Sequence, residues 1–132
     1  MLRASVISFC AALVAFVVLD LPLHFAAVWF GRSEMPIVSA VVGQFLLPFA
    51  PIIVAGLIAG YIGTPRGFVV GLVAGMVGSL VSIVWRHYQV PLGPLAVSPV
   101  YVSIVSWVLG TAMATGICGL AGERMHAKRA AA

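Results

Sequence analysis

Charged side chains are scarce in this sequence of 132 residues. It contains seven Lys or Arg and three Asp or Glu, together 8% of the chain, whereas 63% of the residues are hydrophobic. A soluble domain carries about a quarter charged residues. Because a soluble fold with so apolar a surface would aggregate, the composition predicts one compact domain whose solvent is largely lipid.

Recognisable catalytic and metal-binding motifs are also absent from the sequence. No serine has an identifiable base partner, and the glycines lie in apolar segments without the Lys and adjoining strand of a phosphate loop. Cys10 and Cys118 lack zinc-type spacing, so we interpret them as small hydrophobic residues. Among the histidines, only His24 comes close to the place of a haem ligand in a span. We therefore expect no enzymatic activity, no metal and no cofactor.

Acidic residues are fewer than basic ones, and the formal net charge is +4. Nucleic-acid binding requires a continuous basic face. The basic residues here are scattered at the ends of apolar segments and cluster only at Arg124, Lys128 and Arg129. The pattern excludes a nucleic-acid partner and indicates charges that set membrane topology.

Hydrophobic runs of spanning length, by contrast, occur four times. We expect four helices and a basic tail, at about residues 4–31, 36–63, 67–85, 100–120 and 121–132 respectively. The first run begins like a signal peptide but stays apolar past Asp20 and Pro22, so we interpret it as a long helix. The third, without charge or proline, would form about 28 Å of helix, close to the thickness of a bilayer core. The predicted fold is an all-α integral membrane bundle of four transmembrane helices.

The basic residues also predict how the bundle is oriented. With four spans, the N-terminus, the short loop 64–66 and the tail share one side, which holds five basic residues: Arg3, Arg66, Arg124, Lys128 and Arg129. The opposite side holds Arg32 and Arg86. Because cytoplasmic loops carry the excess of Lys and Arg, both termini are expected to be cytoplasmic, in a cell membrane.

Small residues recur every four positions in three of the predicted helices. These glycine stripes are Gly56 and Gly60; Gly67, Gly71, Gly75 and Ser79; and Ser106, Gly110, Ala114, Cys118 and Gly122. Residues four apart lie on one helix face, and small residues let membrane helices approach closely. One stripe would be used inside a monomer, so several stripes favour packing against another chain; a tight monomeric bundle is the alternative.

The stretch AGLIAGYIGTPRGFVVGLVAGMVGS, residues 55–79, resembles small prokaryotic membrane proteins with glycine-rich paired helices, from domain families of unknown function. The resemblance covers about residues 48–82 and rests on GxxxG spacing. It implies a helical bundle and carries no activity with it.

Asp20 is the only acidic residue well inside a predicted span. A charge in hydrocarbon is costly, so such an acid is a candidate for function. With His24, one turn further on, it would form a proton relay or cation site. Alternatively, Asp20 pairs with Arg86, or is solvated at the interface, because it lies about 25 Å along the helix from Arg3.

Gln44 is the second polar candidate, in a segment interrupted by Pro48 and Pro51. Proline removes a backbone donor and clashes with the preceding turn, so we expect a kink or break near Phe49. Broken helices of transporters bind ions through freed backbone groups. A kink repaired by packing against neighbouring helices is the simpler alternative.

Together these patterns favour a non-catalytic integral membrane subunit. It would pack through its small-residue faces into a larger membrane complex or a homo-oligomer, with the lipid bilayer and other membrane subunits or its own copies as partners. The alternative is a small oligomeric channel or transporter that uses Asp20 and the broken second helix.

Overall fold

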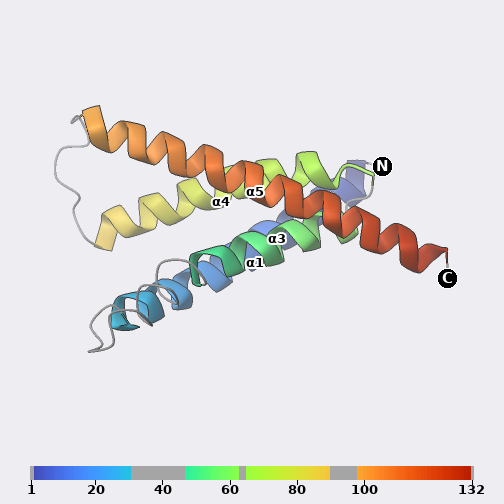
Figure 1. Cartoon of the computed structure of the whole chain (residues 1–132), viewed down its shortest axis with the longest axis horizontal. Helices are drawn as coiled ribbons and strands as arrows, with labels where there is room; N and C mark the ends of the chain where they lie inside the picture. Colours follow the sequence, from blue (N-terminus) through green and yellow to red (C-terminus); the bar gives the residue numbers. More distant parts are fainter. Residues whose placement is uncertain (1, 31–46, 63–64, 90–97, 132) are drawn as a thin grey trace.

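All regular structure in the described part of the chain is helical. A computed structural model describes residues 2–30, 47–62, 65–89 and 98–131. They form four helices (Figure 1): α1 (Leu2–Phe30), α3 (Leu47–Ile62), α4 (Gly67–Gln89) and α5 (Ser98–Ala130).

Three of the helices are long and apolar enough to cross a membrane. The candidate spans are Arg3–Leu23, Gly67–Trp85 and Ser103–Ala130, and α3 adds a shorter apolar segment, Phe49–Ile62. Large apolar side chains are exposed on the outside of the bundle, among them Val14, Val69 and Leu109. This surface is consistent with a multi-pass membrane protein, because such a display of apolar side chains is unfavourable in water.

Helices α3 and α4 occupy the middle of the bundle. They pack against each other, and both pack extensively against α1 and α5. In Figure 1, α1 begins, α3 ends, α4 begins and α5 ends at the same end of the bundle. Toward the other end, the α4–α5 pair diverges from the α1–α3 pair.

The core is narrow and consists mainly of small side chains. Its central cluster contains Ala12, Phe16, Ile52, Ala55, Ala59, Val70 and Ala74. The Phe16 ring of α1 fills the space beside Gly78 of α4, where an added Cβ would lie 2.7 Å from the ring. Such small residues let the helix backbones come close and gain dispersion contacts, which is how helices associate in lipid.

Two helices extend beyond their predicted ends. Helix α4 continues from residue 85 to Gln89, and α5 continues from residue 120 to Ala130, so the expected tail is the last part of α5. The residues 121–130 contain no proline and are rich in Ala, Glu, Arg, Met and Lys, which favour helix. The prediction ended each helix where the apolar run ended, but a helix persists wherever its residues favour it.

Neither Pro22 nor Pro51 ends the helix that contains it. Helix α1 is continuous through Pro22, and α3 is continuous through Phe49 and Pro51. The sequence predicted a kink or a break near Phe49; no break occurs within Leu47–Ile62, and the kink stays a prediction. Pro48 lies in the first turn of α3, where the N–H groups have no intrahelical partner, whereas Pro22 and Pro51 lie inside their helices and each removes one backbone donor. The first part of the predicted second helix lies outside the described residues.

Candidate functional site

Asp20 lies buried between α1 and α4. Its side chain is 8% exposed, and its Oδ2 accepts a hydrogen bond of 2.5 Å from Ser82 Oγ on α4. Ser82 is itself buried. Hydrogen bonds to a charged acceptor are short and strong. The Asp20–Ser82 pair therefore joins two helices and gives the carboxyl group a donor away from water.

The remaining residues of the predicted polar site are only partly within the described structure. His24 follows Asp20 by one turn of α1, and Arg86 follows Ser82 by one turn of α4, so their backbones flank the pair. Their side chains, and Gln44 altogether, lie outside the described residues. The Asp20–Arg86 ion pair and the relay through His24 therefore stay predictions.

The glycines of α3 pack against α5. A Cβ added at Gly56 would lie 2.5 Å from the Thr115 carbonyl oxygen, and one added at Gly60 would lie 2.8 Å from the backbone nitrogen of Glu123. On the α5 side, Gly122 is equally close to the α3 backbone. These distances are too short for any side chain, so this interface requires glycine on both helices.

The glycines of α4 face the same helix. A Cβ at Gly71 would lie 2.6 Å from the Thr115 carbonyl oxygen, and one at Gly75 would lie 2.6 Å from Thr115 Oγ1. Thr115 is fully buried, and its hydroxyl donates to a carbonyl oxygen of its own helix at 2.7 Å. Helix α5 thus lies between the stripes of α3 and α4.

Three helices meet at Gly60, Gly67 and Gly119. A Cβ at Gly67 would overlap the Cα of Gly60, and a Cβ at Gly119 would overlap the carbonyl oxygen of Gly67. Ser79 continues the α4 stripe, is buried, and donates to the Met76 carbonyl oxygen of its own helix at 2.9 Å. Both stripes are therefore occupied within one chain, which removes the argument that several stripes require a second chain.

Gly110 has a different environment from the other described glycines. Apart from its own turn of α5, no atom of the described residues lies within 4 Å of the position of an added Cβ, and Ser106, one turn earlier, is also exposed. Ala114, one turn later, packs partly buried against the core. The predicted α5 stripe therefore lies outside the bundle at one end and reaches the interface at the other.

The buried face of α5 explains this change of environment. It follows steps of three or four residues, through Val108, Thr111, Thr115, Gly119 and Gly122, and Ala112 and Gly116 are buried beside them. A strict four-residue spacing advances by about 40° per step around a helix with 3.6 residues per turn. The stripe from Ser106 to Gly122 thus winds around the helix from its exposed side to its buried side.

Two further polar contacts between helices, beside that of Asp20 with Ser82, were not predicted. Glu123 Oε1 accepts a hydrogen bond from the backbone N–H of Gly67, the first residue of α4. Ser8 of α1 is fully buried and donates to the Ala59 carbonyl oxygen of α3 at 2.8 Å. The sequence shows a polar residue at each position, but neither the composition nor the spacing identifies the helix that it meets.

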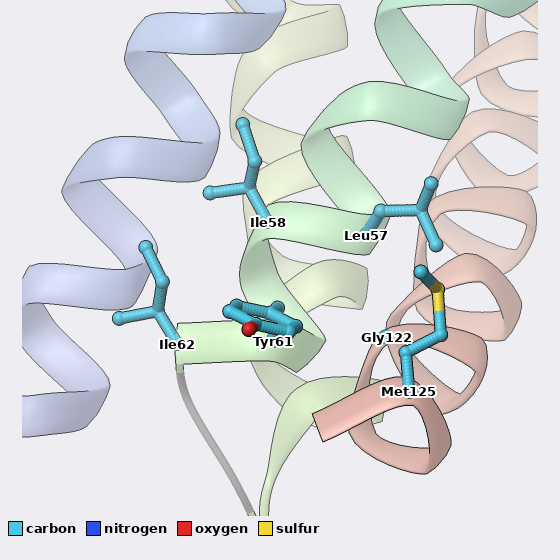
Figure 2. Close-up of a pocket in the computed structure, with 6 residues that line it drawn as sticks. All are labelled: Leu57, Ile58, Tyr61, Ile62, Gly122 and Met125. Atoms are coloured by element: carbon cyan, nitrogen blue, oxygen red, sulfur yellow. The ribbon is translucent and has the colours of Figure 1, made fainter. Parts of the chain in front are cut away.

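An apolar groove lies between α3 and α5, near the end of the bundle where α1 begins. It has a volume of about 240 Å³ and is lined by Leu57, Ile58, Tyr61, Ile62, Gly122 and Met125 (Figure 2). In Figure 2, the side chains of Leu57 and Met125 extend toward each other across the gap between the helices. We call it the α3–α5 groove.

Polar groups adjoin this groove at Tyr61. Arg129 Nη1 donates to the Tyr61 hydroxyl oxygen at 2.6 Å, and the His126 ring meets the Tyr61 ring edge-on, with 5.3 Å between centroids. Arg129 and His126 come from the part of α5 that was expected to be a tail. Sequence reasoning identified the basic cluster but not its contact with α3.

The described groups offer packing, hydrogen bonding and charge. Among the described residues, no group of three or more His, Cys, Asp or Glu side chains could hold a metal ion. In comparisons with known proteins, no family model, no curated protein and no solved structure matches the chain. The resemblance of residues 55–79 to glycine-rich prokaryotic membrane proteins gains no support from them, and the site is interpreted from its geometry.

Proposed function

We propose that this chain is a non-catalytic integral membrane subunit that binds another membrane helix through an exposed face of α5. That helix belongs to a larger complex or to a second copy of the chain. The observation that carries the proposal is the open space at Gly110. Of the ten glycines whose surroundings are described, Gly110 alone has no atom within 4 Å of an added Cβ.

The side chains around Gly110 support this assignment. Ser106 is small and exposed, and the large apolar side chains of Leu109 and Met113 project beside it. Lipid provides little hydrophobic drive for helix association, so close backbone approach at small residues supplies most of the attraction. A small-residue face bordered by larger apolar side chains gives a second helix both a place to approach and surfaces to pack against.

The proposed topology has both termini on the cytoplasmic side. Five basic residues at the end of the bundle where α1 begins support it, all of them exposed: Arg3, Arg66, Arg124, Lys128 and Arg129. Because an excess of Lys and Arg marks the cytoplasmic side, this end would face the cytoplasm. Resistance of the protein to alkaline extraction from membranes tests insertion, and labelling of single cysteines placed at either end in intact cells tests the orientation.

The test of function is the native mass of the chain in mild detergent, with identification of the chains that co-purify. We expect the wild type to elute as a complex and Gly110→Leu to elute as a monomer with unchanged thermal stability. Cys10→Leu, at an exposed small residue of α1, is the matched control and should leave the complex intact. A wild-type monomer, or a complex that Gly110→Leu does not affect, would refute the role of this face.

A small channel or transporter is the second candidate, and burial of Asp20 against Ser82 is the observation that favours it. An acid inside a span marks ion or proton pathways in many membrane proteins. Ion flux into liposomes that is lost with Asp20→Asn, in protein that stays folded, would support transport. Loss of thermal stability alone would assign Asp20 a structural role.

A further inference from the structure

We propose that the α3–α5 groove binds one acyl chain of an anionic phospholipid, and that Arg129 binds the phosphate of the same lipid. This inference rests on the proposed insertion into a membrane. It concerns a surface separate from Gly110, since the groove lies at the opposite end of the α5 span. It assigns the protein a specific lipid ligand rather than the general solvation by lipid that every membrane helix has.

The walls of the groove match a hydrocarbon chain. Leu57 of α3 and Met125 of α5 extend toward each other, and Ile58 and Ile62 line the groove on the side of Tyr61 that is nearer α1 (Figure 2). Gly122 forms the floor, because a Cβ there would overlap the Leu57 carbonyl oxygen. The surface that lines the groove is apolar. An apolar hollow of about 240 Å³ suits part of one acyl chain.

The position of Arg129 suits the headgroup of the lipid whose chain lies in the groove. Its Nη1 donates to the hydroxyl of Tyr61, a residue that also lines the groove. A guanidinium group has five N–H donors in a planar fork that matches phosphate oxygens, so donors remain after the bond to Tyr61. The Tyr61 contact therefore holds the guanidinium beside the groove with most of its hydrogen-bonding capacity unused by that contact.

The charge of this end favours an anionic lipid over a zwitterionic one. Its exposed basic residues are Arg3, Arg66, Arg124, Lys128 and Arg129, whereas the acidic residue among the described residues here is Glu123. The Glu123 carboxylate accepts the hydrogen bond from Gly67. Basic clusters at the ends of membrane helices attract anionic headgroups. The net positive charge and the adjoining apolar groove together provide both parts of a phospholipid site.

Two arginines on different faces of α5 distinguish lipid binding at the groove from a general effect of positive charge. Gly122, Met125, His126 and Arg129 follow the spacing i, i+3, i+4 and i+7, so they share one face of the helix. Arg124 lies on the opposite side of the same turn. A change at Arg129 removes a charge at the groove, whereas the same change at Arg124 removes it from elsewhere on the same helix.

The experiment uses the full chain purified in mild non-ionic detergent. Its melting temperature is measured with phosphatidylglycerol, with phosphatidylcholine of the same acyl chains, and with inorganic phosphate. We expect phosphatidylglycerol to raise the melting temperature by several degrees more than the other two additions. Arg129→Gln should remove most of that difference, and Arg124→Gln should preserve it. Native mass spectrometry should show one retained phosphatidylglycerol per chain.

The groove itself is tested by filling it. Met125→Trp should reduce the response to phosphatidylglycerol, whereas Met76→Trp, at an exposed position of α4 that does not line the groove, should not. Equal responses to both lipids, or equal losses with Arg129→Gln and Arg124→Gln, would overturn the proposal. So would a full response to inorganic phosphate alone. Because these readouts use detergent-solubilised chain, they are separate from the alkaline extraction that tests membrane insertion.

Discussion

The backbone N–H of Gly67 donates a hydrogen bond to the carboxylate of Glu123, so the end of α5 caps the start of α4. The first N–H groups of a helix have no partner within the helix, and an acidic side chain satisfies one of them and interacts favourably with the helix dipole. Here the capping group comes from another helix. The contact fixes the position of both helices at the end where three glycines meet.

Replacement of Glu123 tests how much this cap contributes to the free energy of unfolding. Glu123→Ala removes the acceptor and should lower the free energy of unfolding by about 1 kcal/mol. Glu123→Gln keeps an acceptor of the same shape and should lose less. Thermal or chemical unfolding in detergent provides the measurement. Arg124→Ala, at an exposed neighbouring position, is the control, and an equal loss for it would show that the effect is not due to the cap.

Glycine at the helix crossing should be far more important than glycine on the outer face of α5. Gly119→Ala places a methyl group against the Gly67 carbonyl oxygen, so we expect a loss of about 1–3 kcal/mol from overpacking. Gly110→Ala meets no neighbour and should be neutral or stabilise by up to about 1 kcal/mol, because alanine favours helix. The measurement is the melting temperature of each variant. Similar values for the two variants would contradict the close crossing of α4 and α5 at Gly119.

The hydrogen bond between Ser82 and Asp20 should appear as a coupling energy. In a double-mutant cycle of Asp20→Ala and Ser82→Ala, we expect about 2 kcal/mol of interaction, since hydrogen bonds to charged groups contribute about 1.5–3 kcal/mol. The cycle of Asp20→Ala with Ser8→Ala serves as control, because Ser8 bonds to α3 instead. Coupling that is absent from the first cycle would argue against a direct contact.

The bond between Ser8 and the Ala59 carbonyl oxygen should contribute less. Ser8→Ala should lower the free energy of unfolding by about 0.6 kcal/mol, the average for hydrogen bonds between membrane helices. Ser106→Ala, at an exposed serine of α5, should change it little. Unfolding in detergent of both variants, measured in parallel with the wild type, would show whether burial of the serine determines the difference.

The helices were predictable from the sequence because long apolar runs determine them. The partners of their polar residues were not. Asp20 stands out as an acid in an apolar run, but its donor Ser82 is one of several serines in such runs, and only the packing of α1 on α4 selects it. Likewise, charge and composition suggested that residues 121–132 form a tail, whereas helix-favouring residues and the contact of Glu123 continue α5 to Ala130.

The sequence also did not predict which helix each glycine face contacts. Periodicity shows that Gly56 and Gly60 share a face, and that Gly71 and Gly75 share another, but it does not identify the helix that they meet. The structure brings both faces to α5, near Thr115. A spacing rule of four residues also misses the slow rotation of the stripe on α5, which leaves Gly110 outside the interface.

Because α5 is the common partner of both glycine faces, the order of synthesis matters for assembly. Helices α3 and α4 precede α5 in the chain, so the ribosome completes both before their shared partner exists. Their Gly56 and Gly71 surfaces remain without the contact that fills them until α5 has followed. Truncation before α5 should therefore yield a product that membrane proteases degrade quickly, and the final arrangement of the bundle should form only after translation of its last helix.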